Sequence, residues 1–271
     1  MTEELFFEGV ASYKLLTKKE VGQNFLIDAS VCKRIVDSLD LQPGETALEI
    51  GCGAGSLTYF LKDHDDCDID VIDIDEAMLL KVTDDFKAYP KLHIQYGNAA
   101  KYDYSKYDKI IGNLPYYITS LIIENAVLGA IKSKKMVFMV QKEAADRILA
   151  KPKTKDYSPL SVVLSLCYRC KKLFNVGRNS FVPAPHVDSS VFELVRTEGV
   201  SIQEGAEIFK LCTSLFALRR KTIFNNLKNL IHDADKASTI LARSGIREQA
   251  RPEELTPQEY QALNKALKES L

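Results

Sequence analysis

Five short apolar segments, separated by helix-length stretches, constrain the fold of this chain more than any other feature. They are TALEIG (46–51), DIDVIDI (68–74), LHIQYG (92–97), YDKIIGN (107–113) and KMVFMVQ (135–141). Runs rich in Ile and Val are typical of strands buried on both faces of a sheet. Because parallel strands are joined by crossover helices, the pattern predicts an α/β fold with a Rossmann-like, doubly wound sheet.

The pattern changes after about residue 157. SPLSVVLSL (158–166) and SSVFELV (189–195) are predicted to be strands that extend the sheet as antiparallel edges, with an irregular segment between them. On this basis residues 1–197 form the first domain.

Residues 198–271 show only helical periodicity and are predicted to form a small all-helical C-terminal domain. Gly245 is a stop signal for its third helix. Thr256 and Glu259 form a capping box for the last helix, with Pro257 at the first helical position.

Composition excludes several classes of protein. With 271 residues and 46% hydrophobic content the chain can bury a full core, and it lacks an apolar stretch near the ~18 residues that a membrane span needs. The N-terminal segment does not resemble a signal peptide. Six scattered cysteines do not suggest a disulfide framework, so a cytoplasmic location is expected. The protein is also expected to be a monomer. Cys167 and Cys170 are expected on opposite faces of one strand, and the four histidines lack ligand spacing, so no metal is predicted.

The net charge of −1 means that an anionic partner must be met by local basic segments. Three such segments are KLLTKKE (14–20), KPKTK (151–155) and LRRKTIFNNLK (218–228). Each of them is also compatible with an ordinary solvated surface.

Residues that follow successive parallel strands meet at one edge of the sheet, where ligands bind in such folds. After the first strand comes Gly51, in the sequence EIGCGAGSLT, whose glycines allow close backbone approach to a ligand. Asp73 follows 22 residues later, near the offset of a carboxylate that binds a ribose, although Asp75 is an alternative. The GxGxG spacing favours a nucleoside cofactor over a dinucleotide.

Two further strand ends carry side-chain amides. Asn98 follows the third parallel strand, where its oxygen is able to accept from an adenine amine, and Asn113 lies in GNLPYYIT (112–119) after the fourth.

Together these strand ends resemble the class I methyltransferases that use S-adenosylmethionine, and Asn-Leu-Pro-Tyr is similar to the motif of enzymes that methylate an exocyclic base nitrogen. Further motifs narrow the resemblance to ribosomal RNA adenine dimethyltransferases of the KsgA (RsmA) type. They are GQNFLID (22–28), QKE (141–143), YSPLSV (157–162), FVPAPHVDSSV (181–191) and LRRKTIFNNL (218–227). The matches extend in order from residue 14 to about 265.

The resemblance implies a role for each matched residue. Asn24 and Leu26 would line the methionine end of S-adenosylmethionine, Gly51 its middle, Asp73 its ribose and Asn98 its adenine, although the family usually has Asp at the last position. Asn113 would reach the target base. The implied substrate is two adjacent adenosines in a hairpin loop near the 3′ end of 16S rRNA, in an immature small ribosomal subunit.

The chemistry of adenine N6 agrees with this assignment. Methyl transfer makes this nitrogen positive, so acceptors aimed at its hydrogens favour the transition state. The Asn113 side-chain oxygen and the Leu114 carbonyl are the predicted pair, and Pro115 stiffens the turn. An extruded base is gripped between flat side chains. Tyr116 is the candidate for one face and, by the resemblance, Phe181 for the other, although both are compatible with core packing.

Lys18, Lys19, Arg219, Arg220 and Lys221 are the candidates for phosphate contacts. Three alternatives remain open at this stage. They are a large-subunit (23S) rRNA adenine methylase of the erythromycin-resistance type, a DNA adenine methylase, and a ribosome-assembly factor that acts mainly by binding. By the resemblance, VDSSV and RRKTIFNNL favour the small-subunit type over the first, and the FxPxPxV segment argues against the second.

Overall fold

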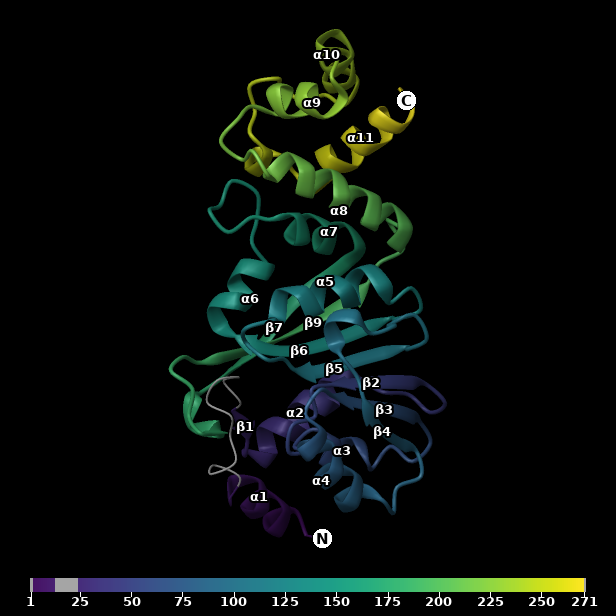
Figure 1. Ribbon diagram of the computed structural model, residues 1–271, viewed down its shortest axis with the longest axis vertical. Helices are drawn as coiled ribbons and strands as arrows, with labels where there is room; N and C mark the ends of the chain where they lie inside the picture. The colour runs from purple at the N-terminus through teal and green to yellow at the C-terminus, as the bar shows by residue number, and fades with distance from the viewer. Residues whose placement is uncertain (1, 13–23, 271) are drawn as a thin grey trace. The chain divides into compact units, whose positions relative to one another are not determined.

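The computed structural model describes residues 2–12 and 24–270 (Figure 1). Contacts divide the chain into two compact units. Unit 1 consists of Met1–Ala145 and Lys171–Arg196, and unit 2 of Asp146–Cys170 and Thr197–Leu271. Sequence patterns place residues 146–170 in the first domain, whereas their contacts group them with the helical unit.

A mixed sheet organises the first unit. Its strand order is β4 (Leu92–Tyr96), β3 (Asp68–Asp73), β2 (Thr46–Ile50), β5 (Lys109–Asn113), β6 (Lys135–Gln141), β9 (Ser189–Arg196) and β7 (Tyr168–Val176). The five strands predicted from the apolar segments are confirmed, and they pair in parallel. The predicted antiparallel strand at SSVFELV is also confirmed, because β9 pairs antiparallel to β6.

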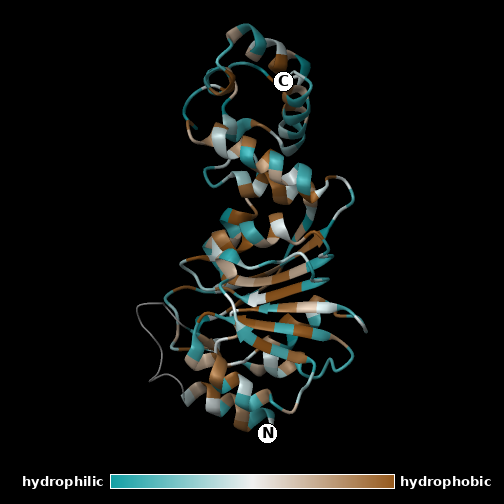
Figure 2. Cartoon of the chain, turned by 45° about the vertical axis from the view of Figure 1, so that its right-hand side comes forward, coloured by the Kyte–Doolittle hydropathy of each residue, from teal (hydrophilic) through white to brown (hydrophobic). Residues whose placement is uncertain are grey.

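The register of the central strands aligns their carboxyl ends. Ile50 of β2 lies opposite Ile72 of β3 and opposite Gly112 of β5. The loops that follow these three strands therefore start side by side. The interior of the strands is apolar, and stretches of brown run along the sheet in Figure 2.

Helices cover the sheet and fix its loops. Helix α2 (Ala29–Leu39) begins after its N-cap Asp28, whose side chain accepts a hydrogen bond from the amide of Val31, and it packs on β5 and β6. Helix α4 (Glu76–Phe86) packs on β3 and β4. The other helices of this part of the chain are α1 (Glu3–Ser12), α3 (Thr58–Leu61), α5 (Thr119–Gly129) and α6 (Lys142–Ile148).

The strand predicted at 158–166 is wrong, because this segment forms helix α7 (Pro159–Cys167). Ser158 caps the helix by accepting a hydrogen bond from the amide of Ser161, and Pro159 occupies the first turn. Nearly every side chain of α7 is buried. A short apolar run that is buried all round has no helical stripe, so periodicity does not distinguish it from a strand.

This correction also changes the expected placement of two cysteines. Cys167 ends α7 and Cys170 lies in β7, so they are not on opposite faces of one strand. Neither sulfur atom forms a disulfide.

The described residues of unit 2 contain the first residues of β7 and several helices. The α-helices that lie wholly within it are α7, α8 (Ile202–Phe216), α9 (Ile223–Ile231), α10 (Ala234–Arg243) and α11 (Pro257–Lys268). Helix α8 packs on α7, and α11 contacts both. The predicted capping box is confirmed, because Thr256 and Glu259 exchange both hydrogen bonds at the start of α11.

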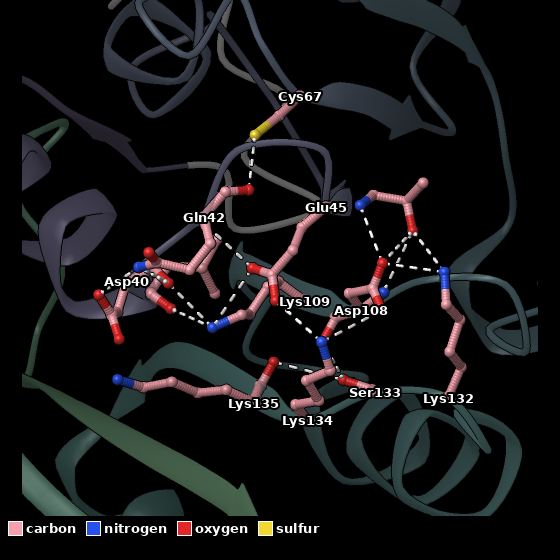
Figure 3. Close-up of polar contacts among 12 residues, drawn as sticks. Asp40, Gln42, Glu45, Cys67, Asp108, Lys109, Lys132, Ser133, Lys134 and Lys135 are labelled. Atoms are coloured by element: carbon pink, nitrogen blue, oxygen red, sulfur yellow. Dashed lines mark hydrogen bonds and ion pairs between the residues drawn. The ribbon is translucent and has the colours of Figure 1, made fainter.

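An ion-pair network lies at the amino ends of β2, β5 and β6 (Figure 3). The buried Lys109 ammonium donates to the carbonyls of Leu39 and Asp40, at 3.3 and 2.9 Å, and lies 3.5 Å from Glu45. Asp108 accepts from the Thr46 amide at 3.0 Å and pairs with Lys132 at 2.9 Å. These contacts tie the C-terminus of α2 to the start of the central strands, at the edge opposite the loops of the candidate site.

Two features are absent from residues 2–12 and 24–270, the ranges that the structure describes. In these ranges no helix is long and apolar enough to cross a membrane. The same ranges contain no group of three or more His, Cys, Asp or Glu side chains that could hold a metal ion.

Candidate active site

A cavity opens at the carboxyl edge of the sheet in unit 1. Its lining comes from the residues around β1 (Phe25–Leu26) and from the loops after β2, β3 and β5. The residues predicted from sequence that line it are Asn24, Leu26, Gly51, Asp73, Asn113, Leu114, Pro115 and Tyr116. Residues from four distant parts of the chain therefore converge as predicted.

The glycine-rich loop after β2 requires glycine at specific positions. Gly51 and Gly53 have φ values of +71° and +51°, a region that residues with a Cβ rarely adopt. A Cβ on Gly51 would lie 3.7 Å from the Asn113 carbonyl oxygen and 3.9 Å from Pro115 Cδ. The loop after β2 thus runs directly beside the Asn-Leu-Pro-Tyr turn.

Asp73 is oriented by two backbone amides. Its Oδ2 accepts from the Gly53 amide and its Oδ1 from the Asp75 amide, both at 2.9 Å. A carboxylate oxygen has further lone pairs, so both oxygens are still able to accept from ribose hydroxyls. The alternative, Asp75, has a structural task as the N-cap of α4, where it accepts from the amide of Ala77.

Leu26 belongs to a small two-stranded sheet that closes one side of the cavity. It lies opposite Phe181 in β8 (Phe181–Val182). The buried Ser56 hydroxyl donates to the Leu26 carbonyl at 2.7 Å. This bond ties the end of the glycine-rich loop to β1, so that Asn24 and Leu26 face the same cavity.

A second cavity adjoins the first and shares Gly51, Asp73, Ile74, Pro115 and Tyr117 with it. Asn98 lines this second cavity.

The Oδ1 atom of Asn98 accepts from the Ala100 amide at 3.0 Å and caps the short helix η3 (Ala99–Lys101). The oxygen expected to serve the adenine amine therefore already accepts one hydrogen bond and keeps one lone pair for a second, and the other polar atom of the amide is the donor Nδ2.

The turn after β5 presents acceptors to the first cavity. The Leu114 amide donates to the Met139 carbonyl at 3.0 Å, and the Pro115 carbonyl accepts from the Thr119 hydroxyl at 2.9 Å. Within the part of the chain that the structure describes, the Asn113 side chain and the Leu114 carbonyl accept no hydrogen bond. These two groups are the predicted acceptors for a base amine, and the turn that carries them is held from both ends.

Tyr116 is fixed by a residue of another strand. Its hydroxyl lies 2.9 Å from the hydroxyl of Ser189, the first residue of β9. Burial raises the pKa of Tyr116, so this phenol stays neutral. The side chain is partly exposed and lines the cavity, an arrangement that allows one ring face to meet a base.

Phe181 lies in the hydrophobic core and not at the cavity. Its side chain is 2% exposed, belongs to the core cluster and does not line either cavity described above. In this structure it supports Leu26, which faces it across the β1–β8 pair. Its role as a stacking face stays a prediction, and that role would require the ring to leave the core.

Sequence patterns did not single out Glu49, although it directly precedes the glycine-rich loop. Its side chain is buried, lines the first cavity and accepts from the Thr58 hydroxyl at 2.6 Å. Burial, with a smaller contribution from the Asp73 charge, raises the pKa of Glu49 to about 7. The signal that could have identified it is an acid inside an otherwise apolar strand.

The basic residues predicted to contact RNA have different surroundings. Lys18 and Lys19 lie outside the described residues. Arg219 donates to the carbonyls of Lys155 and Thr154, at 2.8 and 3.0 Å. It thereby joins two basic segments identified in the sequence, 151–155 and 218–228, within unit 2.

The basic side chains that remain exposed on these two segments are Lys151, Lys153, Lys155, Arg220, Lys221 and Lys228.

The cavities fit a nucleoside cofactor. Left-handed glycines allow close approach to its middle, an oriented carboxylate suits a ribose, and apolar residues such as Ile118 and Ile122 line the second cavity beside Asn98. This sheet, with a glycine-rich loop after its first parallel strand and an acid after the next, defines the class I methyltransferase fold and site.

Comparisons with known proteins specify the family. The model of the ribosomal RNA adenine dimethylase family matches residues 15–269. The chain therefore belongs to this family, and it is a methyltransferase. Methyltransferases of this family and fold use S-adenosylmethionine.

Two relatives are named "Ribosomal RNA small subunit methyltransferase A". The protein from Lactobacillus johnsonii is 36% identical over 96% of this chain and 94% of its own length. The one from Geobacillus sp. is 34% identical over 97% and 96%.

Two solved structures are similar to this chain over most of its length. A dimethyladenosine transferase from Plasmodium falciparum superimposes with a TM-score of 0.76 at 26% identity, over 90% of this chain and 97% of its own. The 23S rRNA methyltransferase ErmE has a TM-score of 0.65 at 22% identity, over 90% and 99%, which shows the shared fold.

Proposed function

We propose that this protein dimethylates N6 of two adjacent adenosines in a hairpin loop near the 3′ end of 16S rRNA, in the immature small ribosomal subunit. The observation that carries the proposal is the contact between the glycine-rich loop and the Asn-Leu-Pro-Tyr turn. Gly51 on the cofactor side lies directly against Asn113 and Pro115 on the base side. A methyl donor and an adenine amine are thereby brought to the same place.

S-adenosylmethionine supplies an electrophilic methyl group when it is bound. Asn24 and Leu26 would hold its methionine end, Gly51 would adjoin its middle, Asp73 would accept from its ribose hydroxyls, and Asn98 would lie at its adenine. The oriented carboxylate of Asp73 and the positive φ of Gly51 support this placement.

On the RNA side, Asn113 and Leu114 supply acceptors for the two hydrogens of N6. Their oxygens stabilise the nitrogen as it becomes positive. Because the turn is rigid, these oxygens do not have to reorient during the reaction. Pro115 and its bond to Thr119 hold that turn. The alkylated nitrogen is acidic enough to lose its proton to water, so no strong general base is needed. After one transfer, a single hydrogen remains for one of the same acceptors.

Tyr116 would stack on the extruded base, because Ser189 holds its hydroxyl and leaves a ring face at the cavity. Lys18, Lys19, Arg219, Arg220 and Lys221 are proposed to lie along the path of the RNA. Arg220 and Lys221 are exposed and suited to phosphate contact, whereas Arg219 organises the surface through carbonyls. The protein would act as a cytoplasmic monomer on a ribosomal precursor.

Two relatives support the small subunit as the substrate. They are 36% and 34% identical to this chain, and both are named as methyltransferases of small-subunit ribosomal RNA. Ser189, which holds Tyr116, belongs to the VDSSV segment that favours the same assignment.

The proposal is tested by methyl incorporation into small subunits that lack this modification. Wild-type protein should transfer up to four methyl groups per subunit, two to each of two adenosines. Asn113→Ala should reduce the rate by at least about 100-fold, the loss typical of removing one transition-state acceptor. Binding of S-adenosylhomocysteine by both proteins shows whether the variant is folded. Equal background incorporation by both proteins would overturn the proposal and favour an assembly factor that acts by binding.

A further inference from the structure

Tyr117 has no role in the site described so far, and its position is unusual. Its side chain is 64% exposed, although it borders both cavities of the site. Most of the ring therefore faces away from the space that a cofactor would fill. A large aromatic ring at the mouth of a pocket offers a π-face to an incoming partner.

The surface beside Tyr117 continues along α5. Leu121, in the first turn of α5, is 44% exposed, and residues four apart on a helix share one face. Another four residues on, Asn125 donates to the Ala100 carbonyl at 2.6 Å. This bond fixes the direction of the face, which runs from the mouth of the cavity toward η3.

A basic side chain lies at the end of η3. Lys101 is exposed and directly follows Ala100, to which Asn125 is anchored. Tyr117 and Ala100 both line the second cavity, so an exposed aromatic ring and an exposed cation lie at its rim. Single-stranded RNA is recognised by stacked bases together with phosphate contacts, which this combination provides.

We infer that Tyr117 stacks on the nucleobase next to the target adenosine, with Lys101 contacting the phosphate backbone as the strand leaves the pocket. The inference rests on the proposed function. Tyr116 and Tyr117 are consecutive, and the proposed substrate is two consecutive adenosines. While one adenosine occupies the pocket beside Tyr116, its neighbour is held by Tyr117. Holding the neighbour unstacked keeps the RNA engaged between the modification of the first and the second adenosine.

The experiment measures kcat and KM with unmethylated small subunits and radiolabelled S-adenosylmethionine. Tyr117→Ala should raise KM for subunits about tenfold, as loss of one stacked base predicts. Tyr117→Phe keeps the ring and should behave like wild type. Ile131→Ala is the matched control, because Ile131 is 68% exposed just beyond the opposite end of α5, and this variant should leave KM unchanged.

Two further readouts separate an RNA contact from a merely structural role. Mass spectrometry of the rRNA should show a larger fraction of Tyr117→Ala products with only one of the two adenosines dimethylated. Lys101→Gln should reduce the slope of log KM against log salt by about 0.7, the value for one phosphate contact on a single strand.

Three results would overturn the inference. The first is an unchanged KM in Tyr117→Ala. The second is a parallel loss of S-adenosylhomocysteine affinity beyond twofold, which would assign Tyr117 to the cofactor. The third is a defect in Tyr117→Phe equal to that of Tyr117→Ala, which would assign the effect to the hydroxyl. Failure of the proposed function is distinct, since wild-type protein would then leave the subunits unmethylated.

Discussion

The hydroxyl of Tyr116 lies 2.9 Å from the hydroxyl of Ser189, a residue 73 positions away in the sequence. This bond connects the turn that presents the acceptors with the start of β9. It gives the VDSSV segment a physical task, which is to hold the ring that would stack on the target base.

Replacing Ser189 with Ala should therefore lower kcat for subunits by about tenfold, because a ring that is free to shift no longer positions the base for in-line attack. Tyr116→Phe loses the same hydrogen bond and should show a similar decrease. The double variant should be no worse than either single variant, as expected for two partners of one interaction.

Ser190→Ala is the matched control for this series. Its hydroxyl is buried and has no hydrogen-bond partner among the described residues, so its removal should leave kcat unchanged and the protein at least as stable. A tenfold loss in this control would show that the β6–β9 edge, and not the Tyr116 bond, is responsible.

Glu49 should make stability depend on pH. Its pKa is about 7 in the folded protein against 4.5 as the ordinary value, so the folded state binds the proton more tightly. The proton on Glu49 therefore stabilises the folded state. This contribution to the free energy of unfolding is complete below about pH 4.5 and is lost as the pH rises through about 7.

Glu49→Gln imitates the protonated form and should match wild type at pH 4, below the ordinary pKa of 4.5. At pH 8 it should be more stable by roughly 3 kcal/mol, seen as a higher melting temperature. Glu198→Gln, at an exposed position, should show no such trend. A Glu49→Gln effect that is the same at both pH values would contradict the account.

Asn98→Asp should strengthen cofactor binding. The carboxylate keeps the cap on the Ala100 amide through one oxygen and gains a second acceptor for an adenine amine in place of the Nδ2 donor. Titration calorimetry with S-adenosylhomocysteine should show about a tenfold lower Kd, as expected for a hydrogen bond to a charged group. Asn98→Ala loses the cap and should bind more weakly than wild type. An Asp variant that binds no more tightly would mean that Asn98 does not meet the amine.

Lys109→Met should destabilise unit 1. The Lys109 side chain is 7% exposed, and its ammonium donates to two carbonyls at the C-terminus of α2, with Glu45 nearby. Removing one partner of a buried ionic cluster typically costs about 3 kcal/mol. Lys91→Met breaks the exposed pair with Asp68 and should cost less than about 1 kcal/mol. Urea denaturation of both variants compares them directly, and equal losses would refute the role of burial.

Much of this architecture can be predicted from the sequence because it is local. The five parallel strands follow from runs rich in Ile and Val, and Asp28 and Thr256 are recognisable caps. The convergence of Gly51, Asp73 and Asn113 follows from strand topology alone. The segment 158–166 was misassigned because a helix that is buried all round lacks a polar face.

The remaining features depend on contacts between distant residues. Ser189 meets Tyr116 only because β9 pairs with β6 in one register, in which Gln141 faces Ser189. The use of the Asn98 oxygen as a cap and the burial of Phe181 opposite Leu26 are likewise decided by tertiary packing. A motif identifies these residues as important without stating which atom is available.

The most direct test of the central claim is a map of dimethyladenosine in both ribosomal RNAs, from cells with and without this protein. We predict that the mark is lost from two adjacent adenosines near the 3′ end of the small-subunit RNA, and that it returns with the wild-type gene but not with Asn113→Ala. An unchanged small subunit together with loss of the mark from the large subunit would contradict the account.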